Sequence, residues 1–422
     1  MYYLFRSMLL GGCVALVFVC TAQSEIHIVV GTPEQGGQYT SVQAAVNAVP
    51  STGTERYVID IMPGIYQERV FVLPDKITLR GMGVLPSDTK LTYFETASTP
   101  PNESTVHAST VIRGKDFIAE NLTFENSAGK NAGQALAIYV RGDRAVFNNC
   151  RFLGWQDTLR SELGRHYFYD SYIEGSVDFI YGKGQAYFEN STLFAKSSGY
   201  LTAQGREQAN ESNGYVFKNS TITGTAPNGS VYLGRPWQAY SRAVFIDSKM
   251  SPVINPAGWS TWSGNNHLTS YFAEYNSMDL NGNPINVSNR VSWSHQLTAA
   301  EIAQFSKEAW LAGSDGWNPV IGVPSDPSAD FDGDGMIDGR DFLIWQRGFG
   351  ATSQNDNSGG DANFDGIVDS DDLAIWQGQY DNSENILSAF VVRVPEPFSW
   401  SILGWTSLLL SSLPVRCDLF HR

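Results

Sequence analysis

The sequence predicts a parallel β-helix built from stacked short strands, followed by a small α-helical calcium-binding module. Three observations carry this prediction: a repeat of short apolar segments within residues 26–312, scarce helical periodicity over the same residues, and a change to acidic composition near the C-terminus. The composition agrees with it, because 42% hydrophobic and 17% charged residues are typical of a globular chain and not of a disordered one.

The repeat consists of two or three apolar residues, a short polar pair that ends in Asn or Asp, and one further apolar position. Its marker residues, spaced by 20 to 29 residues, are Asn121, Asn149, Asp170, Asn190, Asn219 and Asp247. A coil of this length cannot bury its own apolar face, so successive coils must stack. Short strands without crossover helices favour a parallel β-helix, and Asn or Asp suits a left-handed turn residue at each marker. An antiparallel sandwich is the alternative.

One short helix is expected at residues 41–49, because one face of it would be apolar: Val42, Ala45, Val46 and Val49. Four cysteines are present, but only Cys150 lies in the body of the mature protein. A disulfide framework is therefore excluded there, and a buried free thiol is expected.

Both ends of the chain have the composition of targeting segments. Residues 1–22 contain one Arg, an apolar run and a small-residue site, which predicts a secretory signal peptide and a secreted protein. Residues 392–422 contain Pro-Glu-Pro, an apolar run of about 16 residues and a basic end, and they resemble a PEP-type C-terminal sorting signal. A short membrane anchor is the alternative, although the run falls below the roughly 20 residues that span a bilayer.

The net charge of −15 is concentrated in one region. Residues 326–390 hold 14 Asp and Glu against two Arg. This distribution argues against a nucleic-acid partner for either part, and it places the acidity in a separate module. We therefore expect the β-helix at residues 23–313, a linker at 314–328 and a separate module at 329–385.

Two acidic segments in this module have the spacing of calcium loops. Oxygen-bearing side chains at positions 1, 3, 5 and 12, with a Gly at position 6, suit a hard cation that takes oxygen ligands. The expected ligands are Asp330, Asp332, Asp334 and Asp341 in the first loop, and Asp361, Asn363, Asp365 and Asp372 in the second. The duplicated pattern resembles a dockerin, which implies a protein partner or a surface anchor. A solvated acidic linker is the alternative.

A pair of aspartates in the repeat region is the candidate catalytic centre. Asp157 lies eight residues after marker Asn149, and Asp178 lies eight residues after marker Asp170. The two should therefore stack on neighbouring coils, roughly 4.8 Å apart. Two close carboxylates repel each other, so one pKa rises and the other falls, which provides an acid and a nucleophile at one pH. Turn-forming or metal-binding aspartates are the alternative.

Five segments, in order along residues 26–312, resemble the signature segments of the pectinesterase family: GIYQE from Gly64, QALAI from Gln134, GWQDTL from Gly154, GSVDFIYG from Gly175, and LGRPW from Leu233. The resemblance implies a right-handed parallel β-helix and hydrolysis of methyl esters in pectin, with no cofactor for catalysis. Ser171 stands at the position where plant members have a second cysteine, which fits a bacterial member without that disulfide. Together with the expected signal peptide, this implies a bacterial protein that is extracellular or associated with the cell surface.

The resemblance also implies roles for individual residues. Asp178 is expected to be the nucleophile, Asp157 the general acid and then the base, and Gln156 the oxyanion donor. Gln134 is expected to assist Gln156, and Arg235 to hold Asp178 ionised. The residues expected to contact substrate are Thr105, Gln134, Phe179, Tyr181, Arg235 and Trp237. A calcium-dependent pectin lyase or a non-catalytic carbohydrate-binding protein on the same fold are the rival functions.

Overall fold

The computed structural model describes residues 25–50, 53, 55–98, 106–320, 329–332, 336–352, 357–362 and 367–383. They form two compact units, one before and one after residue 328, which are described separately. The expected signal peptide, the sorting tail and most of the linker lie outside these residues. No helix in the described ranges is long and apolar enough to cross a membrane.

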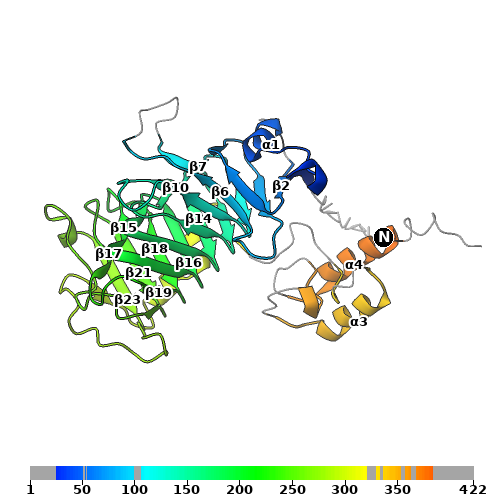
Figure 1. The fold of residues 1–422 in the computed structure, drawn as a ribbon. Coiled ribbons are helices and arrows are strands. Elements are labelled where there is room, and N and C mark those ends of the chain that lie inside the picture. The colour runs from blue at the N-terminus through cyan, green and yellow to red at the C-terminus, as the bar shows by residue number, and fades with distance from the viewer. Residues whose placement is uncertain are drawn as a thin grey trace, which may run out of the picture. The chain divides into compact units, whose positions relative to one another are not determined.

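The first unit is a parallel β-helix with three faces (Figure 1). The first face is an 11-stranded sheet in the described residues, and its neighbouring strands pair in parallel from one coil to the next. In order, its strands are β1 (Ile26–Val30), β2 (Tyr57–Ile61), β5 (Ile77–Gly81), β8 (Ile118–Glu120), β11 (Ala145–Asn148), β14 (Arg165–Tyr169), β16 (Gln185–Glu189), β18 (Gly214–Lys218), β21 (Arg242–Ile246), β23 (Tyr271–Tyr275) and β24 (His295–Gln296).

The second and third faces share two long strands that bend through a corner, β15 (Tyr172–Gly182) and β17 (Thr192–Gln204). The first halves of these strands belong to the second face, together with β3 (Gly64–Gln67), β6 (Thr89–Tyr93), β9 (Thr123–Asn126), β12 (Arg151–Leu153), β19 (Thr221–Gly224) and β22 (Lys249–Met250). Their second halves belong to the third face, together with β4 (Val70–Val72), β7 (Ala108–Ile112), β10 (Leu136–Val140), β13 (Leu159–Ser161) and β20 (Val231–Gly234).

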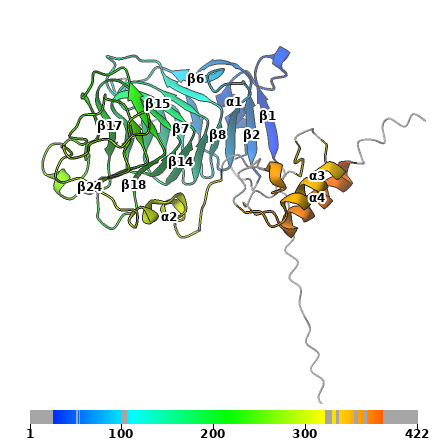
Figure 2. The ribbon, with the colours of Figure 1, turned by 90° about the horizontal axis from the view of Figure 1, so that it is seen from below.

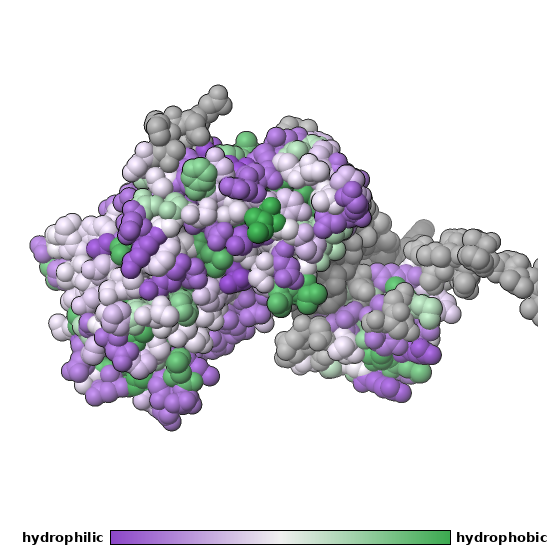
Figure 3. Space-filling view, in the orientation of Figure 1, coloured by the Kyte–Doolittle hydropathy of each residue, from purple (hydrophilic) through white to green (hydrophobic). Residues whose placement is uncertain are grey.

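The interior of the β-helix contains a ladder of stacked rings. On five coils a Phe lies two residues before the marker Asn or Asp, and consecutive ring centroids are 4.4 to 4.7 Å apart: Phe147, Phe168, Phe188, Phe217 and Phe245. The six predicted markers all have left-handed backbone, with φ between 46° and 54°. The repeat prediction is thereby confirmed, and the antiparallel sandwich is excluded. Figure 3 shows a surface on which apolar residues are scattered among polar ones, since most large apolar side chains are interior.

Two smaller expectations are also confirmed. Helix α1 spans Val42–Ala48, and the Ser41 side chain caps it by accepting a hydrogen bond from the Ala44 N–H. The cysteine at position 150 is a buried free thiol, and burial raises its pKa to about 12, which leaves it inert. Short 3₁₀ turns complete the unit at Pro33–Gln35, Asn266–Leu268 and Ile302–Phe305.

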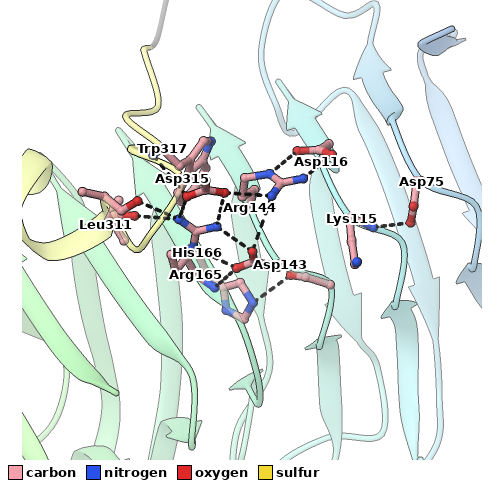
Figure 4. A network of polar contacts seen from close by, with 12 residues as sticks. Asp75, Lys115, Asp116, Asp143, Arg144, Arg165, His166, Leu311, Asp315 and Trp317 are labelled. Carbon is pink, nitrogen blue, oxygen red and sulfur yellow. Dashed lines mark hydrogen bonds and ion pairs between the residues drawn. The ribbon is translucent and has the colours of Figure 1, made fainter. Parts of the chain in front are cut away.

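The segment at residues 307–315, here called the C-terminal strap, packs against the outer side of the first face. Helix α2 (Lys307–Leu311) lies over that face (Figure 2), where the Trp310 indole donates to the Ala186 carbonyl at 3.2 Å. Figure 4 shows the polar network that fastens the end of the strap: Arg165 donates to Asp143 at 2.6 Å and to Asp315 at 2.8 Å. Arg144 also donates to Asp315 at 3.0 Å. The strap is therefore joined to two neighbouring coils.

The second unit is a duplicated pair of short helices, α3 (Gly339–Gly348) and α4 (Ser370–Ser383), with a 3₁₀ turn at Asn357–Gly359. Each half donates one hydrogen bond from an indole N–H to a backbone carbonyl of the other half. Trp345 donates to the Asp369 carbonyl at 2.8 Å, and Trp376 donates to the Asp338 carbonyl at 3.1 Å. These equivalent bonds connect equivalent positions, so the two sequence segments fold as two copies of one motif.

Candidate active site

The candidate site lies at the corner where the chain enters the third face. Leu159 pairs with Ile180, so Asp157 and Asp178, each two residues earlier, lie side by side on neighbouring coils. The Asp157 N–H donates to the Val177 carbonyl at 3.1 Å, which fixes this register. The structure therefore places the two aspartates side by side on neighbouring coils, as the eight-residue offset predicted.

Both aspartates have an unusual backbone conformation. Asp157 has φ 64° and Asp178 has φ 51°, in the left-handed region that Asn and Asp tolerate better than most residues. The pairing of β15 with β17 also shifts in register between Gly175 and Ile180, around Asp178. A left-handed residue turns the chain sharply, and it presents the side chain at the corner instead of along a strand. Such conformations often occur at functional sites.

The two carboxyl groups are buried and titrate differently. The exposed fractions of the residues are 9% for Asp157 and 6% for Asp178. Burial and the neighbouring Asp178 carboxylate raise the pKa of Asp157 to about 7, although Arg160, Tyr181 and Arg235 oppose this rise. Burial also raises the pKa of Asp178 above its ordinary value, although the hydrogen bonds and positive charge of Arg235 oppose this rise. The expectation that one pKa of the pair falls is therefore wrong, because burial raises both. The pair therefore combines Asp157, which readily carries a proton near neutral pH, with Asp178, whose ionised form is favoured by the contact with Arg235.

Arg235 forms a two-point contact with Asp178. Its Nε donates to Oδ1 at 2.9 Å and its Nη2 donates to Oδ2 at 2.5 Å. The guanidinium is held between two rings, 4.0 Å from the centroid of Tyr200 and 3.9 Å from that of Trp262. This bidentate geometry fixes the orientation of the carboxylate and stabilises its ionised form.

Gln134 and Gln156 lie on the same corner, next to Asp157. They form a parallel bridge with each other, and the Ala135 N–H donates to the Gln156 carbonyl at 3.2 Å. Gln134 is exposed and Gln156 is half-buried. The structure thus brings two amide-bearing residues to the corner that carries Asp157, and both are accessible to solvent at least in part.

The structure places the residues expected to contact substrate in different environments. Tyr181 and Trp237 are neighbours on the third face, with ring centroids 6.0 Å apart. The prediction that Phe179 contacts substrate is wrong, because its side chain is fully buried and belongs to the interior core. The left-handed turn at Asp178 and the register shift direct Phe179 inward, where it packs against Gly175, so it has no surface for a ligand. Thr105 lies outside the described residues.

Sequence reasoning missed two features of the site. Arg160 lies on the floor of the third face between two rings, 5.3 Å from the centroids of Tyr139 and Tyr181. The sequence signal that could have identified Arg160 as a site residue is its position on a strand three residues after Asp157. Trp262, which stacks on Arg235, is far from every motif, and no sequence signal marks it.

The candidate metal ligands that the structure describes fall in the second unit. Carboxylate oxygens of Asp330, Asp332 and Asp341 lie within 4.8 Å of one another. Asp341 is buried and accepts hydrogen bonds from the Phe331 N–H at 2.7 Å and the Asp338 N–H at 2.8 Å. In the second loop, Asp361 and Asp372 are buried. Three further expected ligands lie outside the described residues: Asp334, Asn363 and Asp365.

Comparisons with known proteins give a family match for each of the two units. A family model described as Pectinesterase matches residues 27–314, and one described as Dockerin type I domain matches residues 328–377. Pectinesterase 31 of Arabidopsis thaliana is 43% identical over 285 residues, which cover 65% of this chain and 89% of the relative.

Solved structures give the same result. A pectin methylesterase from carrot has a TM-score of 0.61 and 32% identity, covering 68% of this chain and 93% of its own. A pectin methylesterase in complex with a hexasaccharide has a TM-score of 0.58 and 25% identity, covering 69% of this chain and 98% of its own.

Proposed function

Because the chain belongs to the pectinesterase family, we propose that Asp178 and Asp157 carry out its hydrolysis of methyl esters in pectin. The observation that supports this assignment is the pair itself: two buried carboxyl groups on adjacent coils, of which only Asp178 is held by Arg235. The family match makes the chain a pectin methylesterase, and the roles below are our proposal for its own residues.

In the first step, an oxygen of ionised Asp178 attacks the carbonyl carbon of the ester. The amides of Gln156 and Gln134 donate to the oxygen that becomes negative, which stabilises charge where it develops. Asp157 gives its proton to the departing methoxy oxygen, so methanol leaves and an acyl-enzyme anhydride remains. The raised pKa of Asp157 suits it to carry this proton near neutral pH.

In the second step, the roles of acid and base reverse. Asp157, now ionised, takes a proton from a water molecule, whose oxygen attacks the acyl carbon. The anhydride bond breaks, Asp178 returns to its ionised form, and galacturonic acid is released and gives its remaining acidic proton to the solvent, while Asp157 is again protonated. Arg235 orients the Asp178 carboxylate before the first step and after the second, and Tyr181 and Trp237 provide an apolar surface beside it for the sugar and the methyl group.

Methanol release from methyl-esterified pectin, measured for the wild type and two matched variants, tests the proposal. Asp178→Asn removes the nucleophile with little change of shape, and we expect a loss of at least about a thousandfold in kcat. Asp170→Asn makes the same chemical change at an exposed left-handed marker and should keep full activity. Near-normal activity of Asp178→Asn would refute the assignment, and an unsaturated product would point to a lyase.

The second unit belongs with dockerin type I domains, which bind calcium and mediate partnership with cohesin. We propose that each loop holds one Ca²⁺, the first through Asp330, Asp332, Asp334 and Asp341, and the second through Asp361, Asn363, Asp365 and Asp372. The close carboxylates of the first loop fit an oxygen-ligated cation. Together with the catalytic unit, this module indicates an extracellular or cell-surface enzyme. We infer further that the cell is bacterial and that the chain ends direct export and sorting.

Calcium titration of the full chain, followed by indole fluorescence, tests the metal proposal. Trp345 and Trp376 donate to carbonyls at position 9 of the opposite loop, so calcium binding to the loops should change their emission. Asp341→Asn should weaken one of the two binding steps, and a chelator should reverse the change. Methanol release should be unaffected, because no expected ligand lies in the catalytic unit. A flat titration would contradict the proposal.

A further inference from the structure

The third face carries a row of arginines that the proposed mechanism does not use. Arg160 lies on β13, Arg141 directly follows β10 and Arg113 directly follows β7. β7, β10 and β13 are consecutive neighbours on this face. We call these three residues the arginine strip.

The backbone register brings the strip together. Val140 pairs with Ile112, so Arg141 and Arg113, one residue later, lie on adjacent coils roughly 4.8 Å apart along the backbone. Tyr139 pairs with Arg160, and the Arg160 guanidinium lies 5.3 Å from the Tyr139 ring centroid. Burial and Glu162 raise the pKa of Tyr139, and all three arginines of the strip oppose this rise, which places their charges around one phenol.

The charge of the strip is only partly neutralised. Arg160 donates to Glu162 at 2.8 Å. Arg141 and Arg113 are exposed, and among the described residues neither guanidinium has a hydrogen-bond or ion-pair partner. Like charges on adjacent strands cost stability. Two unpaired arginines side by side, on a chain with a net charge of −15, therefore indicate an anionic ligand.

The strip gives the third face two chemically different ends. Tyr181, on β15, lies between the Arg160 guanidinium on one side and the Trp237 ring on the other. Toward the later coils the floor continues with aromatic rings, Trp237 and Trp262. Toward the earlier coils it continues with Arg160, Arg141 and Arg113. A chain that lies across these coils meets an aromatic end and a cationic end, and Asp157, just before β13, and Asp178, on β15, belong to the two coils where these ends meet.

We propose that the arginine strip binds free carboxylates of galacturonate units that have already lost their methyl groups, so that the enzyme prefers esters next to a de-esterified stretch. This inference rests on the proposed function, because it takes the product of that reaction as the ligand. A guanidinium forms charge-assisted, two-point bonds with a carboxylate, whereas a methyl ester offers only a neutral carbonyl oxygen. The strip therefore distinguishes the two states of the same sugar.

Methanol release by Arg113→Gln/Arg141→Gln on two substrates tests this inference. On half-de-esterified pectin, we expect kcat/KM to fall about tenfold, because two charge-assisted contacts are lost. On fully methyl-esterified pectin, kcat/KM should stay within about twofold of wild type, since that substrate has no carboxylate for the strip. Inhibition by a fully de-esterified oligogalacturonate should weaken by about tenfold as well, and added salt should weaken it in the wild type.

Three controls separate the possible outcomes. Lys249→Gln removes an exposed cation from β22 on the second face and should change neither substrate preference nor inhibition. Arg113→Lys/Arg141→Lys keeps the charge without the planar fork and should retain part of the preference. Thermal unfolding of each variant verifies its fold.

Equal effects of Arg113→Gln/Arg141→Gln on both substrates, or unchanged inhibition by the oligogalacturonate, would overturn the assignment of the strip. Failure of the proposed function looks different, because the wild type itself would then release no methanol from either pectin.

Discussion

Two corners of the β-helix use the same backbone conformation for different purposes. At the corner that leaves the first face, left-handed Asn and Asp residues recur from coil to coil, and Asn149 donates to the Asn121 side chain at 3.1 Å. Several of these residues, including Asp170 and Asn219, are exposed. At the corner that enters the third face, Asp157 and Asp178 are left-handed too, but both are buried and one is held by Arg235.

The difference shows that a left-handed turn does not by itself make an aspartate reactive. An Asn or Asp at a left-handed position satisfies the backbone wherever the chain must bend. It becomes reactive only where burial and neighbouring charges separate the proton affinities of two such residues. Between the two corners, Asp170 and Asp178 share residue type and backbone region, so environment alone distinguishes them.

The largest expected effect is on kcat, and it comes from removing the proposed acid, Asp157, at the corner that enters the third face. Asp157→Asn cannot protonate methanol, and we expect kcat on methyl-esterified pectin to fall by about a thousandfold. A substrate ester with a phenolic leaving group needs no proton donor, so it should restore the first step in Asp157→Asn but not in Asp178→Asn. The measurement is release of the alcohol under single-turnover conditions. Equal failure of both variants on the phenolic ester would contradict the separate roles of the two aspartates.

A smaller effect concerns the charge around the second corner. Arg160 favours the ionised form of Asp157, while burial and Asp178 oppose that form, and Tyr181 and Arg235 act in the same sense as Arg160. Removing the charge with Arg160→Gln should therefore raise the pKa of Asp157 above about 7. Because Asp157 must be protonated to release methanol, the alkaline limb of kcat/KM against pH should move to higher pH.

The matched control is Arg151→Gln, which removes an arginine that lies 5.3 Å from the Tyr172 ring centroid on the second face. Its pH profile should coincide with that of the wild type. A shift of the Arg160→Gln profile to lower pH would show that the guanidinium does not act through Asp157.

The smallest effect concerns the first corner alone. Asn219 has φ 52°, a conformation that costs most residues with a Cβ about 1 kcal/mol or more. Asn219→Ala should lower the free energy of unfolding by about that amount, and Asn219→Gly should leave it almost unchanged. Urea unfolding measures both, and methanol release should stay at the wild-type level. A marked loss of activity would mean that the two corners are coupled.

Several parts of the protein follow from the sequence by itself. The marker spacing predicted the coils, the left-handed turns and the stacking of the β-helix, because each depends on local turn chemistry and on apolar segments that must stack. The equal offset of Asp157 and Asp178 from their markers predicted that they would lie side by side. The duplicated acidic spacing predicted the second unit, since calcium loops are set by short-range ligand positions.

Other parts were decided by tertiary structure. Phe179 lies beside a candidate catalytic residue in sequence, yet the register shift at the corner turns it into the core. Trp262 and the unpaired state of Arg141 cannot be read from spacing, because they depend on which distant segments pack together and on where acidic partners happen to lie. The physical reason is that local sequence fixes turns and periodicity, whereas side-chain direction at an irregular corner and the charge around it are set by stacked neighbours from other coils.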